Sequence, residues 1–305
     1  MPDLALLYEH PEWLKPLLGE LDARGVDYRA ITADGHWFDP ARPTPPASLI
    51  FNRIAMSSFL RSTDHPIFFA QSLFAAWEAA GARIINGSRA LAIDSSKARQ
   101  LALIAGLGLA TPETRVVHRR ADLVAAAETL AFPLVVKANI GGSGAGIVRS
   151  DSLAELREQV AQDAVPDSID KIWLVQQFVP ARDGRIIRFE FLDGEFLYAL
   201  SVDGGGGFDL CPADACIAAP GKATVTIERA TPEPAAIDAA RSIITAAQID
   251  VGGVEAMIDD SDGALRFFDV NAFSNFVADP MRVLGWDPTL KLVDWIELQM
   301  KDSTR

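Results

Sequence analysis

The chain contains 305 residues, of which 49% are hydrophobic, so it can bury a core in two or three lobes and is not expected to be disordered. Its net charge is −13, from 41 acidic against 28 basic residues, and no stretch is rich in Lys or Arg. Such a surface offers no basic track for a phosphate backbone, which argues against a nucleic-acid partner.

The sequence shows no targeting or membrane-spanning signal, and it contains two cysteines. The N-terminus lacks a basic segment followed by a long apolar run, and no stretch approaches the roughly 20 apolar residues of a membrane span. We therefore expect a cytoplasmic protein with no membrane partner. Cys211 and Cys216 have no further cysteine or histidine nearby to complete a zinc site. Free thiols are the expected state, a local disulfide or redox switch is the alternative, and their role stays open.

The first 93 residues alternate between strand-like and helix-like stretches. Strands are expected at 4–8, 28–31, 49–52 and 83–86, and helices at 11–24 and 66–80. This order predicts a βα lobe with a parallel sheet. Arg53 follows the third strand, at the edge where ligands usually bind such sheets, so it is a candidate partner for a substrate carboxylate. A surface salt bridge is the alternative.

Two helices and a glycine-rich loop come next. Ser95 and Ser96 can cap a helix that runs to about residue 107, and a short helix is expected at 121–129. The apolar run at 133–136 then ends in Lys137 and leads into a loop with four glycines between 141 and 146. Glycine lets backbone N–H groups turn toward an anion, and the lysine adds a fixed charge. Phosphate binding is favoured over a plain turn, although neither a Walker A loop nor a Rossmann fingerprint is present.

Strand pairs dominate the second half of the chain. Residues 171–179 indicate a buried strand, and 184–200 a hairpin that turns at Asp193 and Gly194. A second, acidic hairpin has its turn at 260–263. It places Asp269 and Asn271 on one face of a strand, with Glu255 across from them. Oxygen ligands of this kind suit Mg²⁺ that is also held by phosphates; a solvated acidic face is the alternative. Helices are expected at 234–247 and 288–301.

From about residue 94 to residue 276 the chain resembles the ATP-grasp superfamily, most nearly the ribosomal-protein glutamate ligases and glutathione synthetase-like carboxylate–amine ligases. The resemblance rests on the order and spacing of short blocks: SSK at 95–97, TPET at 111–114, VVKANIGGSGAGI at 135–147, VQQFV at 175–179, Arg188, GGVEAM at 252–257 and DVNAFSN at 269–275. It implies an α/β fold with α+β lobes in three domains: an N-terminal parallel-sheet lobe at 1–93, a lid-bearing lobe at 94–178 and a C-terminal antiparallel lobe at 179–305.

The resemblance also implies roles for individual residues. Lys97 and Lys137 correspond to the lysines that contact ATP phosphates, and Arg188 to an arginine that stabilises the transferred phosphoryl group. Glu255, Asp269 and Asn271 correspond to the ligands of Mg²⁺, which Mn²⁺ can replace. The lid and the adenine-binding segment correspond to Gly141, Gly142, Ser143, Gly144 and Gly146, and to Gln176, Gln177, Phe178 and Val179.

Several positions depart from the family pattern. Relatives usually carry glutamate at the position of Asp269, which leaves full two-metal catalysis open. Gln177 stands where many relatives have an acid, and Ile186 stands where the glutamate ligases have an aspartate near the ribose. After Asn271 the usual Pro-Gly is missing, and Ser274 and Asn275 join Arg53 as candidate substrate-binding residues. The acceptor therefore differs from that of the glutamate ligases.

The implied reaction is transfer of the ATP γ-phosphoryl group to a carboxylate, followed by attack of an amine on the acyl phosphate, with release of ADP and phosphate. Small-molecule or peptide substrates both fit, and dimers or tetramers are common in the family, so substrates and oligomeric state stay open. Two alternatives remain: a phosphotransferase on the same scaffold, and a nucleotide-binding protein without catalysis.

Overall fold

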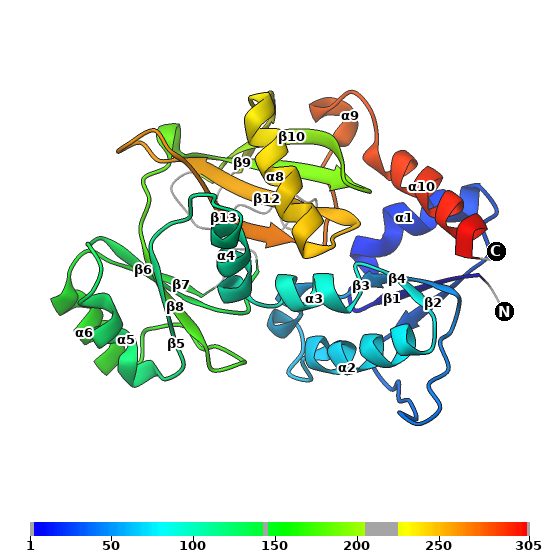
Figure 1. The fold of residues 1–305 in the computed structure, drawn as a ribbon, viewed down its shortest axis with the longest axis horizontal. Helices are drawn as coiled ribbons and strands as arrows, with labels where there is room; N and C mark the ends of the chain where they lie inside the picture. The colour runs from blue at the N-terminus through cyan, green and yellow to red at the C-terminus, as the bar shows by residue number, and fades with distance from the viewer. Residues whose placement is uncertain (1–2, 143–145, 205–224, 304–305) are drawn as a thin grey trace.

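The computed structural model describes residues 3–142, 146–204 and 225–303, and these residues form three β-sheets with helices packed around them (Figure 1). In Figure 1 the first sheet lies to the right, the second to the left, and the third above both. Four residues singled out in the sequence, Ser143, Gly144, Cys211 and Cys216, lie outside the described residues.

The first sheet is parallel, as the alternating pattern predicts. Its strands are β1 (Leu4–Tyr8), β2 (Tyr28–Thr32), β3 (Leu49–Arg53) and β4 (Arg83–Ile85), in the order β2-β1-β3-β4. The helices α1 (Pro11–Ala23) and α2 (Pro66–Ala79) each begin with a proline, whose missing N–H costs nothing in the first turn. A short 3₁₀ helix, η1 (Met56–Leu60), follows β3.

The segment after the first sheet forms two helices where the sequence predicts one. Helix α4 (Lys97–Gly106) begins after Ser96, whose hydroxyl accepts a hydrogen bond from the Arg99 N–H at 3.3 Å. Helix α3 (Ser88–Asp94) precedes it and was not predicted. Seven residues are too short to display a helical period, so the sequence pattern does not reveal this helix.

The second sheet is antiparallel and carries the glycine loop. It consists of β5 (Thr114–Val117), β6 (Leu134–Ala138), β7 (Ile147–Ser150) and β8 (Trp173–Gln177), in the order β5-β8-β6-β7. Two helices, α5 (Leu123–Ala127) and the unpredicted α6 (Leu153–Ala161), lie beside it (Figure 1). Because β6 and β7 pair directly, the glycine loop joins two strands and does not open a helix, as expected.

The third sheet is also antiparallel and contains both predicted hairpins. Its strands are β9 (Arg185–Leu192), β10 (Glu195–Asp203), β11 (Thr226–Ala230), β12 (Val251–Ile258) and β13 (Leu265–Asn271), in the order β11-β10-β9-β12-β13. Helix α8 (Pro234–Ala247), with the predicted bounds, packs against β9 and β12, and α4 packs against β13.

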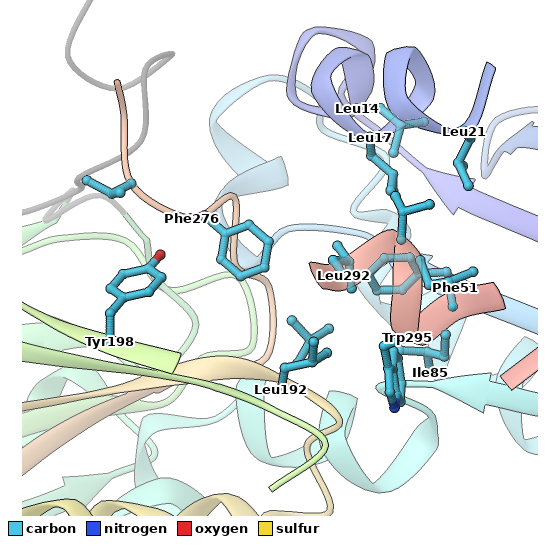
Figure 2. Close-up of a cluster of buried hydrophobic side chains, with 14 of the residues drawn as sticks. Leu14, Leu17, Leu21, Phe51, Ile85, Leu192, Tyr198, Phe276, Leu292 and Trp295 are labelled. Atoms are coloured by element: carbon cyan, nitrogen blue, oxygen red, sulfur yellow. The ribbon is translucent and has the colours of Figure 1, made fainter. Parts of the chain in front are cut away.

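The first and third sheets share one hydrophobic core. Leucines of α1 pack near Leu292 and Trp295 of the last helix, α10 (Pro288–Ser303), and Leu192, Tyr198 and Phe276 extend the cluster toward the third sheet (Figure 2). The preceding helix is α9 (Pro280–Val283). Helix α10 thus lies against the first lobe, although the predicted division places it in the third domain, and the domain boundaries stay a prediction. Among the described helices, none is long and apolar enough to cross a membrane.

Candidate functional site

A cavity of about 480 Å³ lies where the three sheets meet. Most of the predicted site residues line it: Lys97, Lys137, Gly141, Gly142, Gln176, Gln177, Phe178, Val179, Arg188, Glu255, Asp269, Asn271 and Asn275. Among the described candidates, Arg53, Gly146 and Ser274 do not line it. The lining residues divide the cavity into an end with the candidate phosphate and metal residues, an apolar slot and an end toward the first lobe.

The two predicted phosphate lysines are held at the cavity by one asparagine. Asn139 follows β6, two residues beyond Lys137, and accepts hydrogen bonds at its side-chain oxygen from the Ala98 N–H at 2.9 Å and the Ser96 hydroxyl at 3.1 Å. Its backbone oxygen accepts the Lys97 N–H at 3.1 Å. The start of α4 is therefore fixed to the end of β6, which brings together lysines that are 40 positions apart in the sequence.

Lys137 is buried, and this changes its protonation. Burial, and secondly the positive charge of Lys97, lowers the pKa of the Lys137 ammonium to about 7, while the charges of Asp269 and Glu255 oppose the change. Its ammonium group donates no hydrogen bond to another described residue. A buried amine in this state gains from any anion that enters the cavity, since the anion stabilises the charged form.

The acidic hairpin brings the three candidate metal ligands together as predicted. Glu255 on β12 lies directly opposite Asp269 on β13, and the Asn271 amide nitrogen is 3.4 Å from a Glu255 oxygen. Asp269 forms an ion pair with Lys97. Burial, together with the charge of Asp269, raises the pKa of Glu255 to about 7 against the opposing effect of Arg188.

The sequence analysis missed two residues beside this hairpin. The Gln100 side chain, on α4, donates to the Val270 carbonyl at 2.9 Å and accepts the Val270 N–H at 3.1 Å, so it pairs with the backbone between Asp269 and Asn271. Asp94 lines the cavity, and burial, with the charge of Asp269, raises the pKa of its carboxyl to about 7. Both precede strand β13 by more than 160 residues, so only the tertiary fold reveals their role.

Arg188 lies between two buried acids. Its Nε donates to Glu190 at 2.6 Å, and its Nη1 donates to Glu255 at 3.0 Å. Burial lowers the pKa of the guanidinium, but the two carboxylates outweigh burial and raise it above its usual value. Arg188 is therefore charged and fixed at the point where the candidate metal ligands begin.

Glu190 was also missed, and its surroundings are unusual. It is fully buried on β9, two residues after Arg188 and on the same face of the strand. Its second carboxylate oxygen has no hydrogen-bond partner among the described residues. Gly253 on the paired strand lies close to it: a Cβ there would be 2.9 Å from the Phe189 carbonyl oxygen and 3.1 Å from a Glu190 side-chain oxygen. An acid two positions from a candidate arginine in a strand could have been recognised from period-two alternation.

The glycine loop touches the first lobe. A Cβ on Gly142 would lie 2.9 Å from the Ser57 Cβ and 3.2 Å from the Ser57 nitrogen, so only glycine fits this contact without a shift. Gly146, at the other end of the loop, has a φ of 71°, which favours glycine. The described end of the loop at Gly142 therefore contacts Ser57 of η1, and the lid role of the loop stays a prediction.

The apolar slot is the part of the cavity with nonpolar walls. Its walls come from the second and third sheets and consist of Val135, Ile147, Ile186, Met257 and Phe268. At its edge runs the segment from Gln176 to Val179, where the Phe178 ring lies 4.2 Å from the Arg149 guanidinium carbon. Ile186 contributes an apolar wall at the position where the resemblance implies an acid near the ribose.

Near the end of the cavity toward the first lobe, Arg53 does not form the surface salt bridge that was one of the two predictions for it. It is 5% exposed, and it donates to the Ser274 carbonyl at 2.8 Å and to the Asn275 side-chain oxygen at 2.5 Å. The three candidate substrate residues are thus in contact. The Ser274 hydroxyl accepts the Phe276 N–H at 3.0 Å, so this side chain is used in a local turn.

The donor set at the hairpin fits a hard divalent cation, although it is small. Two carboxylates and one amide converge there, which is the kind of oxygen site that leaves room for phosphates. Within the described ranges, no three Asp, Glu, His or Cys side chains gather closely enough to hold a metal by themselves. Any ion here would depend on Asn271 and on ligands from a nucleotide.

Comparisons with known proteins agree with this geometry. A family model described as a RimK-like ATP-grasp domain matches residues 94–296. No curated protein sequence matches the chain. The ATP-grasp ligase PsnB complexed with its minimal precursor is 15% identical with a TM-score of 0.69, covering 98% of this chain and 100% of that one.

Two other solved structures are similar over their whole length. The D-cycloserine synthetase DcsG is 17% identical with a TM-score of 0.66, covering 97% of this chain and 99% of that one. The D-alanine–D-alanine ligase from Bacillus anthracis, complexed with ATP, is 14% identical with a TM-score of 0.68, covering 99% of this chain and 97% of that one. At such identities the similarity establishes the fold, and the fold expected from the sequence is confirmed.

Proposed function

We propose that this chain, which belongs to the RimK-like ATP-grasp family, is an ATP-dependent carboxylate–amine ligase. The reaction would form an amide or peptide bond through an acyl phosphate and release ADP and phosphate. The observation that carries the proposal is the convergence of Lys97, Lys137 and Arg188 with the opposed acids Glu255 and Asp269 on one cavity.

The nucleotide would occupy the cavity from the apolar slot to the glycine loop. The slot would take the adenine ring against Met257 and Phe268, with polar contacts from the segment 176–179. Lys97 and Lys137 would hold the phosphates, with the glycine loop above them. Glu255, Asp269 and Asn271 would hold Mg²⁺, or Mn²⁺ in its place, and the ion would neutralise phosphate charge when bound.

The chain's own residues would catalyse by position and charge. A phosphate next to Lys137 would favour its charged form, so the lysine would become a full cation when the nucleotide binds. Arg188 would stabilise the negative charge that develops during phosphoryl transfer and amine attack. Glu190 would keep Arg188 in place when Glu255 turns to the metal, since it holds the guanidinium from the other side.

The substrates are a carboxylate and an amine, either small molecules or peptides. The similar proteins include one solved with a peptide precursor, a D-cycloserine synthetase and a D-alanine–D-alanine ligase, so the fold serves substrates of both sizes. We infer no nucleic-acid partner from the charge of −13. A cytoplasmic location and a homo-oligomeric state stay predictions.

The test is ATP consumption by the purified protein with Mg²⁺ and a pooled library of carboxylic acids and amines. Nucleotides and new masses are resolved in the same samples. ADP that appears only with the pool, together with a condensation mass, is the expected result. ADP with a stable phosphorylated product and no amide would identify a phosphotransferase, and AMP would contradict the acyl-phosphate route.

A further inference from the structure

Behind the end of the cavity toward the first lobe lies a buried cation with no acidic partner among the described residues. Arg53 is 5% exposed, and no Asp or Glu of the described residues forms an ion pair with it. Its Nε has no hydrogen-bond partner there, and its two hydrogen bonds go to neutral oxygens, the Ser274 carbonyl and the Asn275 amide. Burying a charge without compensation is costly, so this arrangement calls for an anion.

Asn275 connects the guanidinium to the cavity. An arginine can only donate hydrogen bonds, so the Asn275 atom that faces Arg53 must be the amide oxygen. The Asn275 NH₂ group is then left for other partners, and Asn275 lines the cavity whereas Arg53 does not. Arg53 therefore orients Asn275 as a hydrogen-bond donor toward the cavity and places a positive charge directly behind it.

The walls beside this donor are apolar and largely aromatic. The Phe273 ring covers the Arg53 guanidinium at 4.1 Å, and Trp13 packs on Phe273 with ring centroids 5.5 Å apart. Met56 and Phe276 line the same part of the cavity. A ligand whose polar group reaches Asn275 would place its neighbouring group against these side chains.

We propose that Asn275, backed by Arg53, binds a substrate carboxylate that is not the one activated by ATP, with an apolar side chain of the same substrate against Phe273 and Trp13. That the bound molecule is a substrate rests on the proposed ligase function, whereas its carboxylate is inferred from the geometry alone. The reacting carboxylate belongs beside Arg188 and the candidate metal ligands. The Asn275 subsite is built from other elements, β3 and the segment after β13.

A carboxylate fits this position better than a phosphate. Under the proposed function, Lys97 and Lys137 would hold the phosphates elsewhere in the cavity, whereas Asn275 offers one amide group and a single charge behind it. One carboxylate oxygen can accept from the Asn275 NH₂ group in a charge-assisted arrangement. A free apolar amino acid, or a peptide that ends in an apolar residue, has both the carboxylate and the adjacent apolar group.

The test measures binding without nucleotide, by calorimetry, so that it does not depend on turnover. The probes are N-acetylated phenylalanine, leucine and methionine, each as the free acid and as the carboxamide. The wild type is expected to bind the acids about tenfold more tightly than the matched amides, as is typical of a hydrogen bond to a charged group. Similar affinities within each pair, or no binding of any acid, would overturn the subsite.

Two substitutions of Asn275 keep the test independent of a folding failure. Asn275→Asp places an acid against Arg53, so it should remove the preference for acids and raise the melting temperature by about 2 °C. Asn275→Leu should remove the preference without that stabilisation. Gln248→Glu adds a charge at an exposed position outside this cavity and should change neither property. An Asn275→Asp protein that keeps the preference for acids would refute the proposal.

The two proposals fail separately. If the wild type binds acids more tightly than amides but shows no ATP-dependent reaction, the ligase function is refuted and the carboxylate subsite is retained. ATP turnover with new amide products, combined with equal binding of acids and amides, would refute the subsite alone.

Discussion

The two ends of the cavity treat buried charge differently. At the end with the candidate phosphate and metal residues, Lys97 pairs with Asp269, and Arg188 pairs with Glu190 and Glu255, so of its three cations only Lys137 has no ion pair among the described residues. At the opposite end, Arg53 has only neutral oxygens as partners among the described residues. Burial alone lowers its pKa to about 9, with no acid to oppose the effect.

This difference separates two ways of preparing a site. The paired end keeps its charged groups in place before a ligand arrives, at the cost of ion pairs that must rearrange when a metal and phosphates bind. The unpaired end keeps its charge available, so one anion can bind without displacing an acid. Positioning of reacting groups benefits from the first arrangement, and selection of a substrate benefits from the second.

The largest effect should come from Lys137→Ala, which removes the buried cation of the paired end. We expect ATP-dependent activity to fall about a thousandfold, because a preorganised charge at the transferred phosphoryl group is lost. The fold should persist with an unchanged or higher melting temperature, since burial disfavours this charge. Steady-state kinetics and thermal unfolding measure both.

An exposed lysine provides the matched control for this substitution. Lys15 is 67% exposed in α1 and forms an ion pair with Glu12, so Lys15→Ala should leave activity unchanged. A wild-type rate in Lys137→Ala would contradict the proposed site at the paired end.

Glu190→Gln should weaken the paired end by a smaller factor. Arg188 would keep only Glu255, which is also a candidate metal ligand, so its guanidinium would lose its fixed position. We expect kcat to fall roughly tenfold to a hundredfold with little change in KM for ATP, as when an oriented transition-state contact is lost. Glu228→Gln breaks the exposed pair with Arg185 and is the control. A change confined to KM would show that Glu190 does not position Arg188.

The sequence predicted the paired end better than the unpaired end. Lys137, Asp269 and Asn271 lie in regular strands, where period-two alternation and a hairpin turn define which residues face each other. Short motifs in a fixed order were sufficient to recognise the family. The parallel first sheet was also predicted correctly, because strand-like and helix-like stretches alternate along that part of the chain. Helix 234–247 was predicted correctly because its apolar period extends over 14 residues.

What the sequence missed depends on contacts between distant segments. Gln100 acts through the backbone of Val270, and Arg53 through Asn275, more than 200 residues away. Neither contact leaves a local pattern. Helix α3 was missed because seven residues give no period, and the surface salt bridge considered for Arg53 was wrong because an arginine after a short strand looks exposed until a distant segment covers it.

Asp94→Asn tests how much the ionisation of a buried carboxyl at the paired end lowers the free energy of unfolding. Burial, with the charge of Asp269, raises the pKa of Asp94 from 3.8 to about 7, so the native state binds this proton more tightly than the unfolded chain does. Its contribution to the free energy of unfolding is therefore full below about pH 4 and is lost as the pH rises through about 7. Asparagine cannot ionise, so the variant should be more stable than the wild type at about pH 8, by at least about 1 kcal/mol. Denaturant unfolding of both proteins at about pH 8 and about pH 4 should show that the difference in stability between variant and wild type vanishes at the lower pH. An equal difference in stability at the two pH values would exclude the titration of Asp94 as its cause.

The smallest effect is expected at the contact between the glycine loop and the first lobe, which joins the two ends. In Gly142→Ala the new methyl group would meet Ser57 at 2.9 Å, so the loop must shift away from η1. Because a loop can relax, we expect only about a fivefold rise in KM for ATP, near the lower limit for overpacking. Adding Ser57→Gly to the Gly142→Ala variant removes the Ser57 Cβ, which is the closest atom, and should restore part of the affinity for ATP. Gly106→Ala, which meets no atom within 4 Å, is the control. If Gly142→Ala and Gly106→Ala bind ATP equally well, the contact with Ser57 does not hold the loop over the nucleotide, and the two ends of the cavity work without this link.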